Sequence, residues 1–143
     1  MKKIFYLFLV TTLLSLTSCS NNGMDDADAF VGYYTLSVIE DVVLGNDKGT
    51  LNDNGVIMIT KISENKVKIT GYITSEGEVS GSLLYIKGGY YSDESGYFTT
   101  SYGKGKLDGN ILTFTANQTG QLKYNGIYYP YRNSSYFTAI KTE

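Results

Sequence analysis

Hydrophobic and polar residues alternate along the chain from residue 30 onward. Between residues 66 and 73, Val67, Ile69 and Ile73 share one face of an extended segment. Lys66, Lys68, Thr70 and Tyr72 share the other, outward face. A period of two is typical of a strand with one buried and one solvent-exposed face. This part of the sequence has no convincing run with the period of about 3.6 residues that marks an amphipathic helix. The pattern therefore predicts an all-β domain.

The predicted strands are β-rich segments bounded by glycine, asparagine and aspartate. In chain order they are Phe30–Val38, Gly55–Ile62, Lys66–Thr74, Glu78–Ile86, Tyr90–Thr100, Gly105–Leu107, Ile111–Ala116, Gln121–Tyr131 and Ser135–Lys141. Short hairpin loops are expected at 63–65 and 108–110, so the strands form an antiparallel meander. About eight or nine such strands protect their edges by closing into a barrel or, as the alternative, by stacking as a β-sandwich. The residues expected to point into the core are Tyr34, Leu36, Ile69, Ile73, Leu83, Leu112 and Phe114.

The first 18 residues follow a different pattern. Lys2 and Lys3 precede an apolar run from Ile4 to Leu14, and small residues follow. A membrane-spanning helix needs about 20 apolar residues, which this run does not reach. The segment 1–18 is therefore predicted to be a cleaved signal peptide.

Leu16-Thr17-Ser18-Cys19 contains the one cysteine of the chain. This stretch resembles the lipobox of bacterial lipoproteins, in which an aliphatic residue and two small residues precede a cysteine. The resemblance implies that Cys19 receives a diacylglycerol on its sulfur, becomes the new N-terminus, and carries a further acyl group such as palmitate. Several acyl chains together form a stable membrane anchor. The expected location is the cell envelope, on the outer membrane, with the leaflet left open.

Charge and composition narrow the function of the mature chain. Cleavage after residue 18 removes two of the 12 basic side chains and leaves all 14 acidic ones, a net charge of −4. Such a domain is a poor candidate for binding nucleic acid or an anionic membrane face. The sequence has no histidine, which excludes Ser-His-Asp and Cys-His sites and the commonest zinc ligand. We expect no cofactor, no metal and no enzymatic activity.

The domain organisation follows from these segments. After the signal peptide, residues 19–29 are expected to form a lipidated N-terminus and a mobile stem, because small and acidic residues cannot bury a core. Residues 30–143 form the β-domain. Within it, the polar stretch NDKGTLNDNG at 46–55 is faintly similar to a calcium loop. Thr50 and Lys61 would stand at the first and the twelfth position of such a loop, and neither supplies the oxygen ligands that calcium requires there. A polar loop without calcium is therefore expected at 46–55.

Phe30-Val31-Gly32-Tyr33-Tyr34 opens the β-domain, and NGVIMITKISENKVKITGYI and GKLDGNILTF follow later. These stretches resemble small lipocalin-like, or calycin-type, domains. The resemblance implies a small antiparallel barrel, either filled by side chains or holding a shallow pocket.

Tyrosine is the most conspicuous residue type, and ten of the 14 tyrosines lie between residues 85 and 136. Neighbouring tyrosines on a strand point to opposite faces, so one of each pair is expected to be exposed to solvent or to line the opening of the barrel. Tyrosine rings stack on sugars and their hydroxyl groups bond to them. The candidate ligand-binding residues are Tyr90, Tyr91, Tyr128, Tyr129 and Tyr131. The alternative is that these tyrosines simply favour strands and cross-strand pairing.

Three hypotheses for function remain, besides a purely structural envelope protein with no ligand. The leading one is a lipid-anchored, non-enzymatic module that binds a small apolar ligand, a glycan or an envelope protein. The second is a β-sandwich carbohydrate-binding module that uses surface tyrosines. The third is a small hydrolase with paired carboxylates, for which the candidates are Glu40-Asp41, Glu76 with Glu78, and Asp93-Glu94.

Overall fold

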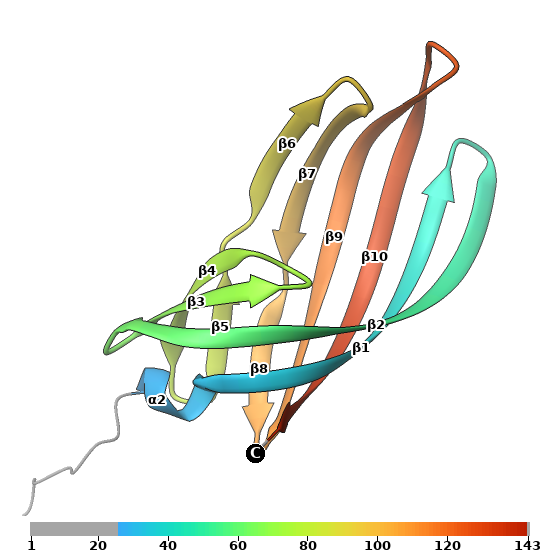
Figure 1. The fold of residues 1–143 in the computed structure, drawn as a ribbon. Coiled ribbons are helices and arrows are strands. Elements are labelled where there is room, and N and C mark those ends of the chain that lie inside the picture. The colour runs from blue at the N-terminus through green and yellow to red at the C-terminus, as the bar shows by residue number, and fades with distance from the viewer. Residues whose placement is uncertain (1–25, 143) are drawn as a thin grey trace, which may run out of the picture.

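The computed structural model describes residues 26–142, which form one short helix and ten strands (Figure 1). Helix α2 covers Asp26–Phe30. The strands are β1 (Gly32–Leu44), β2 (Asp47–Ser63), β3 (Lys66–Gly71), β4 (Ser75–Ser80), β5 (Leu83–Ile86), β6 (Gly89–Asp93), β7 (Gly96–Tyr102), β8 (Lys104–Asp108), β9 (Ile111–Tyr124) and β10 (Ile127–Thr142). The predicted signal peptide, residues 1–18, and Cys19 lie outside the described residues.

Eight of these strands form a closed ring in the order β1-β2-β3-β4-β5-β8-β9-β10, since β10 pairs with both β9 and β1. Every pairing in the ring is antiparallel. The prediction of an all-β antiparallel barrel is confirmed, and the sandwich alternative is not what forms. The β6–β7 hairpin stands beside the ring, where β7 pairs with the outer part of β9.

Strand length differs strongly around the ring. β3 and β4 have six residues and β5 has four, whereas β1, β2, β9 and β10 have between 13 and 17. The long strands therefore continue past the barrel, together with β6 and β7, toward the top of Figure 1. We call these continuations the extended sheet.

The extended sheet corrects two expectations. Residues 46–55 are not a loop, because β1 runs to Leu44 and pairs with β2 up to Asp47. The segments 111–116 and 121–131 are not separate strands either; β9 is continuous, and its hairpin to β10 turns at Asn125-Gly126, both with positive φ. The physical reason is that a sheet continuing beyond the core has solvent on both faces, so the hydrophobic alternation fades while the hydrogen bonds persist.

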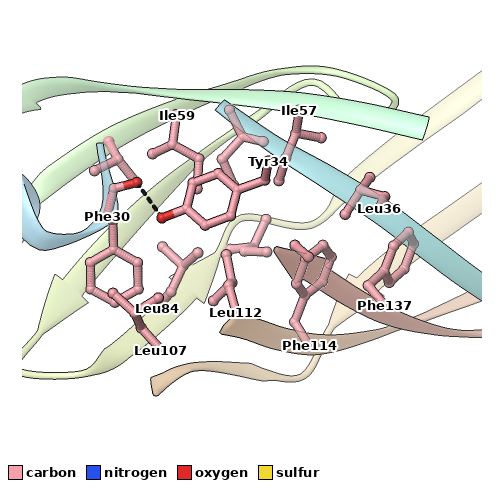
Figure 2. Close-up of a cluster of buried hydrophobic side chains, with 14 of the residues drawn as sticks. Phe30, Tyr34, Leu36, Ile57, Ile59, Leu84, Leu107, Leu112, Phe114 and Phe137 are labelled. Atoms are coloured by element: carbon pink, nitrogen blue, oxygen red, sulfur yellow. Dashed lines mark hydrogen bonds between the residues drawn. The ribbon is translucent and has the colours of Figure 1, made fainter. Parts of the chain in front are cut away.

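The core consists of inward side chains from the ring strands (Figure 2). Phe114 stacks on Phe137 with ring centroids 4.4 Å apart. Tyr34, Leu36, Ile69, Leu112 and Phe114 are buried as predicted, and Ile73 is partly buried against the core. The prediction for Leu83 was wrong: its neighbour Leu84 is the fully buried residue, and Leu83 points outward.

Helix α2 closes one end of the barrel. Ala27 and Phe30 are fully buried, and the Tyr34 hydroxyl donates a 2.8 Å hydrogen bond to the Phe30 carbonyl oxygen (Figure 2). Burial raises the pKa of Tyr34 to about 12. The Ala27 amide donates to the Glu64 carbonyl oxygen in the β2–β3 turn. Residues 26–29 were expected to belong to the mobile stem, and Phe30 to a strand. They form this helix because Ala27 and Phe30 supply an apolar pair that the open barrel end can bury.

Replacing Phe114 with alanine should lower the free energy of unfolding by about 3–5 kcal/mol, because the change removes a buried ring and leaves a cavity beside Phe137. Thr113→Ala on the exposed face of the same strand is the matched control and should change stability far less. Urea denaturation followed by circular dichroism measures both. Equal effects from the two substitutions would contradict the assignment of the core.

Candidate functional site

The five predicted tyrosines lie on the extended sheet, in β6 and β10, and strand alternation divides them between its two faces. Tyr91, Tyr129 and Tyr131 continue the inner face of the barrel, as the register with β7, β9 and β10 shows. Tyr90 and Tyr128 project from the outer face and are 68% and 50% exposed. The structure therefore brings three of the five predicted residues to one surface and places the other two on the opposite surface.

Tyr91 and Tyr131 belong to one row of rings. Tyr91 stacks on Phe98 with centroids 6.5 Å apart, and Phe98 meets the edge of Tyr131 at 5.3 Å. We call Tyr91, Phe98 and Tyr131 the aromatic row. The row crosses β9 at Gly120, which pairs with both Phe98 and Tyr131. A side chain on Gly120 would collide with the Tyr97 carbonyl oxygen and the Phe98 Cα atom.

The hydroxyl end of Tyr91 is held in place by the turn that follows β6. Tyr91 donates a hydrogen bond to Asp93. Asp93 also accepts hydrogen bonds from the backbone amide and the hydroxyl of Ser95, at 2.7 and 2.6 Å. The hydrogen bonds from Ser95 and Tyr91 lower the pKa of Asp93, so it remains a carboxylate near neutral pH. A ring fixed in this way loses little freedom when a ligand stacks on it.

Polar side chains lie between the aromatic row and the core. Asn133 and Ser135 are buried polar residues on β10, and Glu40 faces them from β1. The Ser135 hydroxyl oxygen lies 3.3 Å from both Glu40 Oε1 and Asn133 Oδ1. Gln118 of β9 pairs with Asn133 on one side and with Thr100 of β7 on the other, and its Nε2 atom lies 3.5 Å from Thr100 Oγ1. We call these five residues the polar layer.

Tyr72 lies across the same end of the barrel. Its hydroxyl donates to Asp53 Oδ2 at 3.0 Å, and its ring meets the edge of Phe137 at 6.2 Å. Partial burial, the bond to Asp53 and the charge of Glu40 raise the pKa of Tyr72 to about 12. Tyr72 was assigned to the outward face of its strand, but Gly71 has a φ of +116°, and the chain leaves the regular alternation there.

A hollow of about 210 Å³ opens at the break between β5 and β6. Its lining includes Tyr91 of the aromatic row, Thr100 of the polar layer, and Tyr102, whose ring packs near Phe114. Typical small-molecule pockets measure about 300–1,000 Å³, so this hollow suits part of a ligand, such as a single ring. We call the surface formed by the aromatic row, the polar layer and this hollow the mouth.

The three carboxylate pairs considered for a hydrolase do not face each other across the mouth. Glu40 points inward, whereas Asp41 points outward and accepts a 2.8 Å hydrogen bond from Thr50. Glu76 and Glu78 both lie on the outer face of β4. Asp93 and Glu94 lie at the β6–β7 turn.

Among residues 26–142, no group of three or more histidine, cysteine, aspartate and glutamate residues is placed to hold a metal ion. Over the same range, no helix has the length and apolar character needed to cross a bilayer.

Comparisons with known proteins found similarity among solved structures. No protein-family model matches the sequence, and no curated protein is significantly similar to it. A solved structure from Nostoc punctiforme, a protein of unknown function from the DUF3598 family, aligns with 8% sequence identity and a TM-score of 0.36. The alignment covers 81% of this chain and 49% of that one, so this chain spans about half of that protein. A similarity this low does not indicate a shared function.

Sequence reasoning missed Phe98, Gly120 and Tyr72. Phe98 is a single aromatic residue in a predicted strand, and only the register with β6 and β9 places it between two tyrosines. Gly120 fell in a segment read as a break between strands. The alternation from Val67 to Ile73 predicted the wrong face for Tyr72, and the glycine before it was the available signal.

Replacing Gly55 with alanine should displace Tyr72, because the new Cβ atom would lie 2.5 Å from the Tyr72 ring. Once the ring leaves, the pKa of Tyr72 should fall from about 12 toward its ordinary value of 10. A pH titration by NMR with labelled tyrosine measures this pKa. Gly49→Ala is the control on the same strand, since nothing lies within 4 Å of its Cβ position. An unchanged pKa in Gly55→Ala would show that Tyr72 does not lie against Gly55.

Proposed function

We propose that this chain is a lipid-anchored, non-enzymatic binding protein of the cell envelope, and that the mouth binds a neutral glycan. The observation that carries the proposal is the aromatic row, in which three rings stand side by side next to a layer of hydrogen-bonding side chains. A lipid-anchored binding module was the leading hypothesis from the sequence, with a glycan as one of its candidate ligands.

The chemistry of the mouth suits a sugar better than an apolar ligand. Sugar rings present C–H faces that pack on aromatic rings and hydroxyl groups that need polar partners. Tyr91 is 56% exposed, and Phe98 and Tyr131 are partly exposed, so the row can receive a ligand from solvent. The polar layer lies directly beside it. An apolar ligand would leave Glu40, Asn133 and Ser135 without water and without new partners, which is costly.

The carboxylates near the mouth already have structural partners, which supports a binding role. Glu40 is within hydrogen-bond distance of Ser135, and Asp53 accepts from Tyr72. Asp93 accepts from Ser95 and Tyr91. The chain also has no histidine to serve as a general base near neutral pH.

The anchor rests on the lipobox resemblance at Leu16–Cys19. Helix α2 closes the barrel at the end opposite the extended sheet (Figure 1). A tether that enters the domain at α2 leaves the mouth free to meet a ligand. An outer-membrane location remains part of this proposal.

Removing a ring from the aromatic row should weaken glycan binding by roughly tenfold or more, because buried aromatic contacts dominate binding energies. Tyr131→Ala and Phe98→Ala are the test variants, and Tyr128→Ala and Tyr136→Ala, both exposed on the outer face of β10, are the controls. Affinity electrophoresis against a panel of soluble neutral polysaccharides measures retention. Equal weakening by outer-face and inner-face variants, or retention of none of the polysaccharides by the unmodified protein, would overturn the proposal.

Replacing Cys19 with alanine should abolish lipidation, because the side chain no longer offers a thiol to alkylate. The variant should remain uncleaved or become soluble, whereas the unmodified protein enters the detergent phase on Triton X-114 partitioning. Mass spectrometry of the mature N-terminus checks the acyl groups directly. A Cys19→Ala protein that is cleaved and still enters the detergent phase would contradict the anchor.

A further inference from the structure

The outward side chains divide the barrel wall into two unlike halves. Strands β3, β4, β5 and β8 form one half of the ring, and β9, β10, β1 and β2 form the other. The first half, together with the residue that follows β5, exposes five lysines, namely Lys66, Lys68, Lys87, Lys104 and Lys106. We call this half the lysine face.

The strand register brings these lysines together across the sheet. Lys66 pairs with Glu78, Glu78 with Tyr85, and Tyr85 with Lys104, so all four lie in one row. Lys68 pairs with Glu76, and the Lys87 amide donates to the Glu76 carbonyl oxygen in the next row. Lys106 pairs with Leu83 on the other side.

Charge is distributed unevenly over the molecule. Of the ten basic side chains in residues 26–142, five lie on the lysine face, whereas only three of the twelve acidic ones do, Glu76, Glu78 and Asp108. The remaining described residues therefore have a clear acidic excess. In the opposite half of the barrel, the outward positions between residues 33 and 39, 56 and 60, 111 and 115, and 136 and 142 carry no charged side chain.

The lysines are not neutralised by close ion pairs on this face. The Lys66–Glu78 pair is long, at 3.9 Å, and both side chains are more than half exposed. The Lys104 ammonium lies 5.5 Å above the Tyr85 ring. Between these strands a hollow of about 440 Å³ opens on the surface, and its lining includes two lysines, two glutamates and a tyrosine, namely Lys66, Lys87, Glu76, Glu78 and Tyr85. The hollow itself therefore has no net charge, and the excess positive charge of the lysine face lies around it, on Lys68, Lys104 and Lys106.

The N-terminal segment enters the domain beside the lysine face. Helix α2 packs against β2, β3 and β4. The Asp26 carboxylate accepts a 2.7 Å hydrogen bond from the Gly81 amide, in the turn between β4 and β5. Cys19 precedes Asp26 by seven positions, and covalent geometry limits such a segment to a reach of about 25 Å. An acylated Cys19 would thus keep this part of the barrel wall close to the membrane.

We propose that the lysine face docks on the anionic surface of the membrane that holds the acyl chains, with lipid phosphate groups as its partners. This inference rests on the proposed anchor and adds an orientation to it. Lysines are attracted to an anionic membrane within about 8 Å at physiological salt, so they act only when a tether keeps them near. The sequence argued against binding to an anionic membrane because the mature chain has a net negative charge. Net charge is a sum over the whole domain, so it does not show that one half of the barrel wall carries an excess of lysines.

Lysine reactivity in vesicles tests the orientation at single residues. The full mature lipidated protein is placed in vesicles of phosphatidylcholine, or of phosphatidylcholine with phosphatidylglycerol, and labelled with a membrane-impermeant acylating reagent. Mass spectrometry then gives the labelling rate of each lysine. In anionic vesicles, the five lysines of the lysine face should react roughly fivefold more slowly than in neutral vesicles, and added salt should abolish the difference. Lys48 and Lys123, on the distant hairpins of the extended sheet, are internal controls and should react equally in both.

The outcomes separate the docking from the anchor. A protein that floats with both kinds of vesicle but shows the same labelling in each overturns the docking alone. A protein that floats with neither overturns the anchor, and the docking with it.

The variant with Lys68→Glu, Lys104→Glu and Lys106→Glu should lose the protection of Lys66 and Lys87, whereas Lys48→Glu with Lys123→Glu should keep it. These exposed substitutions leave the core untouched, and circular dichroism checks the fold. Protection that survives the first variant would also overturn the proposal.

Discussion

The antiparallel pairing of β1 with β10 is the constraint on which the rest of the structure depends. The register runs without a break from Tyr33 with Thr142 to Leu44 with Tyr131. In its inner part, this pairing closes the ring and seals the core. In its outer part, the same hydrogen-bonded ladder continues beyond the core and carries Glu40, Asn133 and Tyr131 on its inner face. The mouth is therefore built on the strands that hold the barrel together, which makes it a rigid surface.

The difference in strand length gives the barrel two unlike ends. At one end lie the β2–β3, β4–β5 and β8–β9 turns, and α2 fills the opening with Ala27 and Phe30. At the other end four long strands and the β6–β7 hairpin continue as a sheet, and Tyr72 leans across toward Asp53. Two glycines make this end possible, since Gly55 leaves room for the Tyr72 ring and Gly120 lets two strands approach closely. The Tyr72 side chain occupies the space beside Gly55, and the backbone of β7 occupies the space beside Gly120.

The sequence predicted most of the barrel but less of its mouth, for physical reasons. Alternation is strong where one face is buried, so the core residues on β1, β3 and β9 were predicted correctly. It failed at Leu83 and Leu84, because two adjacent apolar residues do not show which one points inward. It also failed where the sheet continues beyond the core, because there neither face is buried. Asn125-Gly126 is a strong hairpin signal in this region, but hydrophobic alternation alone did not detect it. For the candidate site, the alternation of side chains along a strand correctly predicted that neighbouring tyrosines lie on opposite faces. It could not predict the contact of Phe98 with Tyr131, because that contact depends on the register between distant segments.

The extended sheet has two sides on which backbone groups have no neighbouring strand. One is β6, and the other is the part of β2 before Ile57, where pairing with β3 begins. Such edges can recruit the edge of another chain and begin aggregation. Asp47, Lys48 and Asp53 line the β2 edge with charge, so two copies cannot join there without bringing like charges together or burying unpaired ones. The open side of β6 has only Asp93, at its end, and is the less protected of the two. Resistance to self-association is therefore unequal along this sheet and weakest beside Tyr90 and Tyr91.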